Sequence, residues 1–275
     1  MSRFGEKILS MLSPKTAGDA FGDPTLSLPV QFETIKKRSI EKKSPEKFLE
    51  NINLNFYAAT FPNFYSYILG KRVLDFGCGE GAHTIALAKA GASFAFGLDK
   101  TPYKYAYADV YAREHGLSGV VEFGEILRDV HDGFFDTVIS MNAFEHFSDA
   151  AGVLQNMRRL LKPGCALLLS FGPPWYSPSG VHNYFFIRIP WANILFSEKT
   201  IMNVRRKYID EDKHYYHEIS LNKMSVKKYE TIMRNSDLRF VYRQYDCIKR
   251  MNFLATIPLV RELFVNRITC ILRRD

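Results

Sequence analysis

The chain has 275 residues, of which 47% are apolar and 24% charged, a length and composition that suit one large soluble α/β domain with or without a substantial insertion. No stretch approaches the roughly 18 uninterrupted apolar residues that span a bilayer, and Glu6 and Lys7 precede any apolar run, so neither a spanning helix nor a signal peptide is expected. The net charge of +8 comes from short basic groups with no accompanying nucleic-acid motif, and four scattered cysteines without a CxxC pair favour a reducing, cytoplasmic location.

The first 44 residues are mixed in character. Two glycines and two prolines between positions 18 and 29 break any long periodic element, which indicates a loose arm or a cover over the site. Ser44-Pro45-Glu46 then has the pattern of a helix N-cap followed by proline at the first helical position. A helix is therefore expected to run from there towards Thr60, with these side chains on one face: Phe48, Leu49, Ile52 and Phe56.

Strands and helices are expected to alternate from residue 71 onward. Short apolar strands are predicted at 72–76, 94–98, 120–123, 134–140 and 166–171, with helices at 82–90, after Pro102 and at 149–161. This alternation predicts a parallel, doubly wound sheet. Residues 172–222 break the rhythm, and a helix at 225–235 and strands at 239–248 and 267–272 close the chain. The expected organisation is an arm at 1–44 and a domain at 45–275, with 172–222 as an acceptor-side insertion.

A glycine-rich turn follows the first expected strand and reads Asp75-x-Gly77-x-Gly79-x-Gly81. Glycines permit positive φ and close approach of the backbone to a ligand, and the free N–H groups of the following helix favour a negative group. Asp99 stands at the end of the second strand, where a carboxylate can accept hydrogen bonds from ribose hydroxyls. Gly77-x-Gly79-x-x-Ala82 also satisfies the fingerprint of dinucleotide enzymes. The pattern therefore indicates a nucleoside site and leaves both ligand classes open.

Residues 71–172 resemble class I S-adenosylmethionine-dependent methyltransferases. Residues 73–81 match the first motif of that family, including the Asp two positions before the first glycine, and residues 96–99 match the second. Residues 135–140 followed by Glu145-His146 match the fourth, and residues 160–164 precede the fifth strand as in the family. The resemblance implies a Rossmann-like, mostly parallel seven-strand sheet with an antiparallel last strand, and S-adenosylmethionine rather than NAD as the ligand.

The resemblance also implies which residues meet the donor. The methionine part is expected on the glycine loop, the ribose on Asp99, and the adenine near Glu125 and Ile126, where Glu125 replaces the commoner Asp of the family. The full set of candidate cofactor-binding residues is Asp75, Phe76, Gly77, Cys78, Gly79, Gly81, Asp99, Lys100, Glu125, Ile126 and Asn142.

Three polar residues after strands four and five are the candidate catalytic groups: Glu145, His146 and His182. Two imidazoles and a carboxylate can hold a divalent metal, and some related enzymes that methylate hydroxyls do so, but Asn142 stands where their first Glu would be. No metal is therefore the expectation, with His146 or His182 as a general base near the ordinary histidine pKa of about 6.5. A purely structural role for Glu145 and His146 stays open. His214 and His217 are expected to make packing or acceptor contacts.

The aromatic insertion at 172–222 resembles that of a subgroup of bacterial methyltransferases often associated with surface-polysaccharide or other glycan pathways. Aromatic faces suit a sugar ring or a lipid tail, so the predicted activity is O-methylation of a sugar, glycan or related small-molecule hydroxyl. A non-catalytic donor-binding subunit, a nucleic-acid methyltransferase and a lipid acceptor at a membrane surface are the alternatives. No Asn/Asp-Pro-Pro-Tyr/Phe sequence follows strand four, which argues against N-methylation of a base. Peripheral membrane contact and the oligomeric state remain open.

Overall fold

The structure is a computed structural model that describes residues 5–6, 45–125, 132–182, 187, 189–207 and 211–275. The arm expected at 1–44 lies almost wholly outside the described residues, as does Ile126. Within the described part of the chain, no helix has both the length and the apolar character needed to cross a bilayer.

A seven-stranded sheet forms the centre of the molecule, with the strand order β3-β2-β1-β4-β5-β7-β6. The first five strands run parallel, whereas β7 is antiparallel to both of its neighbours. The strands are β1 Arg72–Phe76, β2 Phe94–Leu98, β3 Val121–Gly124, β4 Phe135–Met141, β5 Leu161–Phe171, β6 Leu238–Cys247 and β7 Val265–Arg274. This order and the antiparallel last strand confirm the predicted doubly wound, mostly parallel fold, and the bounds of β1 and β2 are those expected.

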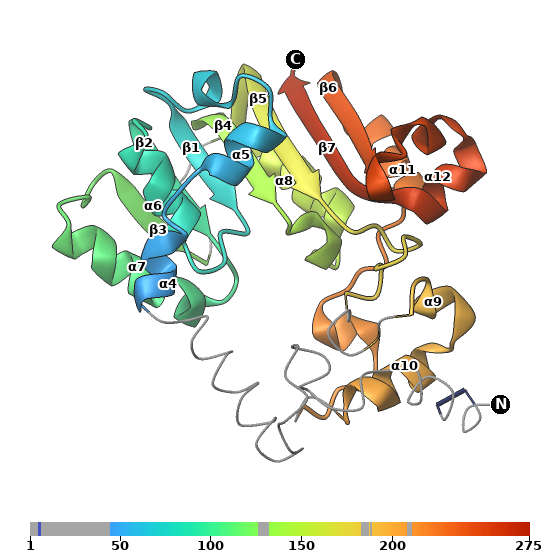
Figure 1. The fold of residues 1–275 in the computed structure, drawn as a ribbon. Coiled ribbons are helices and arrows are strands. Elements are labelled where there is room, and N and C mark those ends of the chain that lie inside the picture. Colours follow the sequence, from blue (N-terminus) through green and yellow to red (C-terminus); the bar gives the residue numbers. More distant parts are fainter. Residues whose placement is uncertain (1–4, 7–44, 126–131, 183–186, 188, 208–210) are drawn as a thin grey trace.

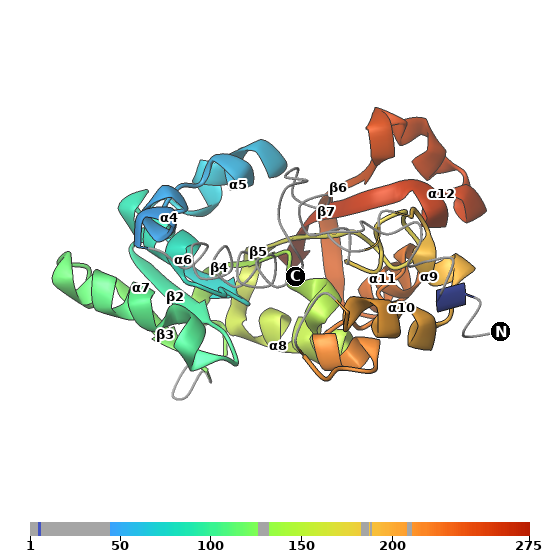
Figure 2. The ribbon, with the colours of Figure 1, turned by 60° about the horizontal axis from the view of Figure 1, so that its bottom comes forward.

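Helices cover both faces of the sheet (Figure 1 and Figure 2). One apolar cluster joins the N-terminal helices, α6 and α7 to one face, and a second joins α8 and α11 to the other. The helices around the sheet are α4 Pro45–Glu50, α5 Asn55–Thr60, η1 Phe64–Tyr67, α6 Ala82–Lys89, α7 Pro102–Glu114, η2 Phe144–His146, α8 Ala150–Leu160 and α11 Val226–Arg234. The connection from β6 to β7 holds η4 Ile248–Arg250, η5 Asn252–Thr256 and α12 Pro258–Phe264.

The single helix expected up to Thr60 is wrong, because the chain forms α4 and α5 with a break between them. The side chain of Asn53 donates to the Glu50 carbonyl at 2.7 Å and accepts from the Asn55 N–H at 3.2 Å. Asparagine competes in this way with the backbone bonds of a helix. The buried face of this segment therefore differs from the expected one: Leu49 on α4 and Phe56 on α5 are exposed, and the buried side chains are Phe48, Leu54, Tyr57 and Phe61.

The segment expected as an insertion holds the short helices α9 Ala192–Leu195 and α10 Glu198–Arg205 and the turn η3 Tyr216–Ile219. It has a small apolar cluster of its own, which includes Val181, Ile201, Met202 and Tyr216. In Figure 1 these elements lie at the lower right, on the side towards which β1 and β5 point. The insertion is therefore placed near the carboxyl ends of the parallel strands, where open α/β sheets bind their ligands.

Candidate functional site

The turn between β1 and α6 contains three glycines with positive φ: 84° at Gly77, 56° at Gly79 and 79° at Gly81. A Cβ at Gly77 would lie 2.7 Å from the Ala143 Cβ, and one at Gly81 would lie 2.6 Å from the Phe123 ring. Both glycines are thus required by the packing of the fold. A Cβ at Gly79 would meet nothing within 4 Å. Gly79 therefore presents bare backbone to open space, which is what the close approach of a ligand requires.

Asp99 lies directly beside this turn. Its Oδ2 accepts from the Gly79 N–H at 3.1 Å and its Oδ1 from the Thr101 N–H at 3.0 Å, and the Lys104 ammonium lies 3.9 Å away. A carboxylate has about four acceptor sites, so these two bonds leave capacity for the hydroxyls of a ribose. The open backbone at Gly79 and the adjacent carboxylate together fit the sugar and methionine parts of a nucleoside donor.

Asp75 is inside the protein, with 2% of its surface exposed. Its Oδ2 accepts from the Thr84 hydroxyl at 2.8 Å, which ties β1 to α6. Burial raises the pKa of Asp75 to about 6, the Thr84 bond lowers it in part, and the Asp99 charge raises it further. Asp75 therefore links the two elements on either side of the glycine turn.

This raised pKa predicts a pH-dependent stability difference. The folded state holds the Asp75 proton up to about pH 6, whereas an unfolded aspartate loses it near pH 3.9, so stability falls as the pH rises through this window. We expect Asp75→Asn, whose amide oxygen can still accept from Thr84, to remove this loss and to gain about 3 kcal/mol over the parent chain near pH 7. Urea unfolding at a series of pH values measures it, with the exposed Asp109→Asn on α7 as the control. Parallel pH slopes in parent and Asp75→Asn would contradict the prediction.

The other expected donor residues surround the turn. Cys78 is buried, which raises the pKa of its thiol, and the Phe76 ring lies 5.6 Å from the Phe147 ring. Glu125 and Lys100 are exposed at the ends of β3 and β2. Asn142 follows β4 with φ of 51°, donates its N–H to the Ser170 carbonyl at 2.8 Å and accepts from Arg267 at 3.2 Å.

Tyr57 on α5 is a residue of this region that the sequence analysis missed. Its side chain is 2% exposed and its ring centroid lies 4.8 Å from that of His83. Burial raises the pKa of its phenol, and the charges of Asp75 and Cys78 raise it further. Only the break between α4 and α5 brings this side chain inward, and no periodicity signalled that break.

His146 and Glu145 lie on η2, just after β4. The His146 Nδ1 is 2.8 Å from the Ser220 carbonyl, and since a carbonyl only accepts, Nδ1 carries the proton and Nε2 has the free lone pair. Glu145 is 3% exposed, and its Oε1 accepts from the Gly172 N–H at 3.3 Å. Burial raises the Glu145 pKa, while the neighbouring His146 and Arg267 lower it. His146 therefore has the tautomer that a general base needs.

His182 lies beside His146, with ring centroids 5.5 Å apart, and its Nε2 donates to the Pro173 carbonyl at 3.1 Å. Burial and the nearby His146 together lower the His182 pKa to about 4, although the bond to the Pro173 carbonyl raises it in part. The expected pKa near 6.5 is therefore wrong for His182, whereas a role for His182 as a general base stays a prediction. Within the described ranges, no group of three or more His, Cys, Asp or Glu side chains is placed to hold a metal ion. The side chains of Glu145, His146 and His182 therefore do not form such a group.

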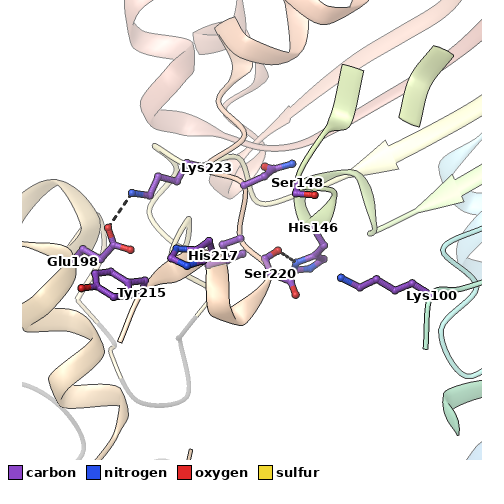
Figure 3. Close-up of a pocket in the computed structure, with 10 residues that line it drawn as sticks. Lys100, His146, Ser148, Glu198, Tyr215, His217, Ser220 and Lys223 are labelled. Atoms are coloured by element: carbon purple, nitrogen blue, oxygen red, sulfur yellow. Dashed lines mark hydrogen bonds and ion pairs between the residues drawn. The ribbon is translucent and has the colours of Figure 1, made fainter. Parts of the chain in front are cut away.

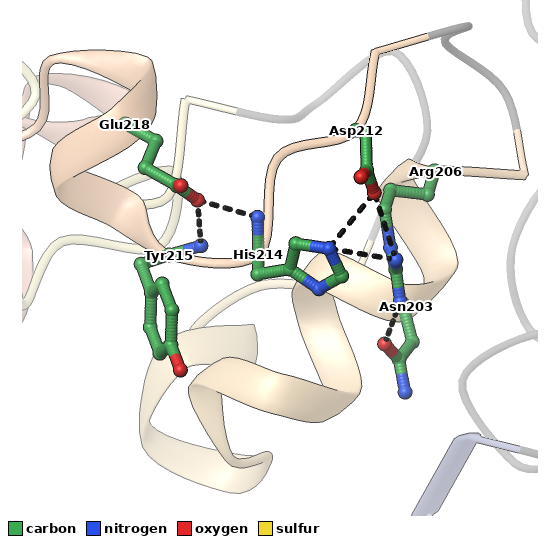
Figure 4. A network of polar contacts seen from close by, with 6 residues as sticks. All are labelled: Asn203, Arg206, Asp212, His214, Tyr215 and Glu218. Atoms are coloured by element: carbon green, nitrogen blue, oxygen red, sulfur yellow. Dashed lines mark hydrogen bonds and ion pairs between the residues drawn. The ribbon is translucent and has the colours of Figure 1, made fainter.

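A cavity of about 360 Å³ opens beside His146 (Figure 3). We call it the acceptor cavity, after the role that we propose for it. Its lining comes from the ends of β2 and β4 and from the insertion: Lys100, His146, Ser148, Glu198, Tyr215, His217, Ser220, Leu221, Asn222 and Lys223. His217, for which packing or acceptor contacts were expected, lies in this lining. His214 instead belongs to a polar network with Arg206 and Asp212 (Figure 4).

Asn222 fastens the insertion to η2. Its side-chain amide donates to the Phe144 carbonyl at 2.9 Å and the Phe147 carbonyl at 2.8 Å, and its N–H donates to the Glu145 carbonyl at 3.1 Å. These bonds hold the neighbouring Ser220 carbonyl where it orients His146. The sequence analysis did not select Asn222 or Ser220, because they are 74 or more residues away from their partners.

The comparisons agree with this geometry. Residues 69–177 match the family model described as a methyltransferase domain. The chain is 38% identical over 112 residues to a ubiquinone biosynthesis O-methyltransferase of Methylococcus capsulatus, an alignment that covers 40% of this chain and 47% of that protein. The chain thus spans about half the length of the curated relatives it matches.

Two solved structures share the fold at low identity. A geranyl diphosphate methyltransferase in complex with SAM superposes with a TM-score of 0.53 at 13% identity, over 93% of this chain and 94% of that one. A protein from Listeria monocytogenes, described as a presumed S-adenosylmethionine-dependent methyltransferase, superposes with a TM-score of 0.53 at 16% identity, over 82% and 99% of the two chains.

Proposed function

We propose that this chain, whose residues 69–177 form a methyltransferase domain with S-adenosylmethionine as its cofactor, methylates a hydroxyl group of a small, polar acceptor. A sugar or glycan hydroxyl is the acceptor that we favour. One observation carries the proposal, the tautomer of His146 beside the cavity. The Nδ1–H of His146 donates to the Ser220 carbonyl, so the Nε2 lone pair is available to take a proton from a molecule in the cavity.

The donor, when bound, supplies an activated methyl group. The residues of this chain then have two tasks, alignment and proton removal. Gly79 and Asp99 hold the nucleoside and methionine parts at the ends of β1 and β2. The His146 Nε2 takes the proton of the acceptor hydroxyl, and the buried carboxyl of Glu145 next to it stabilises the imidazolium that results.

The lining of the acceptor cavity favours a polar acceptor over a long apolar chain. All of its lining residues except Leu221 carry a polar or charged side chain. Two of them, Glu198 and Lys223, form an ion pair at 3.0 Å. A polyprenyl tail could not form hydrogen bonds with the polar groups of this lining and would remove them from water, which costs free energy, whereas a hydroxyl-rich molecule can bond to them. The similarity to ubiquinone-pathway enzymes covers 40% of this chain, so it supports O-methylation and leaves the acceptor open.

Methyl transfer from isotopically labelled S-adenosylmethionine to a panel of sugars, phenols and amines tests this function. We expect donor binding in the micromolar range, an O-methylated product, and a rate unchanged by a chelator, because the described residues provide no metal-ligand cluster. Transfer only to amines, or loss of transfer with the chelator, would contradict the proposal. Donor binding without turnover on any acceptor would favour the non-catalytic subunit instead.

A further inference from the structure

A second cavity, of about 270 Å³, lies on the face of the sheet that carries α5. Its walls are the end of α5 and the outward face of the β6–β7 pair. The lining residues are Ala58, Ala59, Thr60, Phe61, Pro62, Tyr242, Gln244, Asp246, Arg267 and Thr269. This volume lies just below the range of about 300–1,000 Å³ that is usual for ligand pockets. The cavity therefore has room for one small unit of a ligand.

The β6–β7 wall changes from apolar to polar along its length. Ile271 of this face belongs to the apolar core, whereas the next pairs in register are Gln244 opposite Thr269 and Asp246 opposite Arg267. On β6 the Tyr242 hydroxyl donates to the Gln244 carbonyl oxygen, and the Gln244 amide donates to Asp246. These bonds hold the polar groups in a row along one wall of the cavity.

Arg267 connects this cavity to the donor and acceptor region. Its Nη1 donates to the Asn142 Oδ1 at 3.2 Å and to the Ser170 Oγ at 3.5 Å, at the ends of β4 and β5. The Phe56 ring lies 4.8 Å from its guanidinium carbon. Burial lowers the Arg267 pKa, while the carboxylates of Asp246 and Glu145 raise it, so the group stays charged between the cavity and η2.

We propose that this second cavity binds a hydroxyl-rich unit of the acceptor, such as a sugar ring linked to the one that is methylated; this assignment rests on the proposed function. Arg267 provides planar N–H donors, Asp246 provides acceptors, and Gln244 and Thr269 provide both. Such a mixture matches hydroxyl groups, each of which donates and accepts. The small side chains of Ala58 and Ala59 on α5 leave the space for a ring.

Saturation-transfer NMR and titration of the full chain with methyl glycosides of glucose, galactose, mannose and N-acetylglucosamine test the assignment. We expect at least one glycoside to bind at millimolar concentration, and Gln244→Ala and Asp246→Ala each to weaken that binding at least fivefold. The matched controls are Gln155→Ala on the exposed side of α8 and Asp109→Ala on α7, which should bind as the parent chain does. Thermal midpoints of all four variants verify that they fold.

Two outcomes would overturn the assignment: no glycoside binds, or binding is the same in Gln244→Ala, Asp246→Ala and the controls. The methyl-transfer assay separates this result from the fate of the proposed function. If methyl is transferred to a sugar hydroxyl but no glycoside binding depends on Gln244 and Asp246, the assignment of the second cavity is wrong and the proposed function stands. If glycoside binding depends on these two residues but methyl is transferred to no hydroxyl, the proposed function is wrong and the cavity stays assigned as a sugar site.

Discussion

His146→Gln is expected to lower kcat for methyl transfer by about two to four orders of magnitude, the usual contribution of a positioned general base. The glutamine side chain can still donate to the Ser220 carbonyl, so the insertion stays fastened, but it cannot take a proton at the position of Nε2. The affinity for S-adenosylmethionine should stay within about twofold, because the donor residues lie on the turn after β1 and at the end of β2. Steady-state kinetics together with a donor titration measure both quantities.

His217→Gln is the matched control, because His217 lines the same cavity but is not adjacent to Glu145 in the chain. We expect it to change KM more than kcat. A kcat for His146→Gln within threefold of the parent value would show that His146 is structural, as the sequence alone allowed. His182 should not contribute to the pH profile above about pH 5, because its pKa is about 4.

Gly81→Ala and Gly79→Ala are expected to separate the glycine required by the fold from the one required by the ligand. Alanine at Gly81 adds left-handed backbone strain of about 1–2 kcal/mol and places its Cβ 2.6 Å from the Phe123 ring and 2.7 Å from the Ala108 Cβ. Overpacking of this kind costs about 1–3 kcal/mol. We therefore expect Gly81→Ala to lose about 3 kcal/mol of unfolding free energy, measured by urea denaturation.

Gly79→Ala should lose only about 1 kcal/mol, from the positive φ alone, because its Cβ would meet no protein atom within 4 Å. The same Cβ points into the space assigned to the donor, so the affinity for S-adenosylmethionine should fall at least tenfold in calorimetric titration. Equal losses of stability in the two variants, or full donor affinity in Gly79→Ala, would contradict this division of roles.

The insertion has a larger part in the site than its short helices suggest. The Asn222 side chain bonds to the backbone of η2, the Ser220 carbonyl bonds to the His146 ring, and Tyr215 and His217 line the acceptor cavity. The domain matched by the family model ends at residue 177. Ser220, which orients the proposed base, and most of the residues that line the cavity therefore lie outside that domain.

Local sequence patterns determined the order of elements and the donor turn. The strands at 72–76 and 94–98 were predictable because a buried parallel strand is a short apolar run, and the turn at Gly77–Gly81 because positive φ and close packing both require glycine. Asp99 followed from its place at the end of a strand. All of these signals lie within about 30 residues of one another.

Only the tertiary structure decided which side chains meet across long separations. The Asn53 side chain ended α4 early and turned Tyr57 inward, burial lowered the His182 pKa, and Ser220 and Arg267 reached His146 and Asn142 from 74 and 125 residues away. The physical reason is that periodicity and composition report each residue's own backbone preference and burial, whereas a tautomer, a pKa or a cavity depends on neighbours brought close by the folding of the whole sheet.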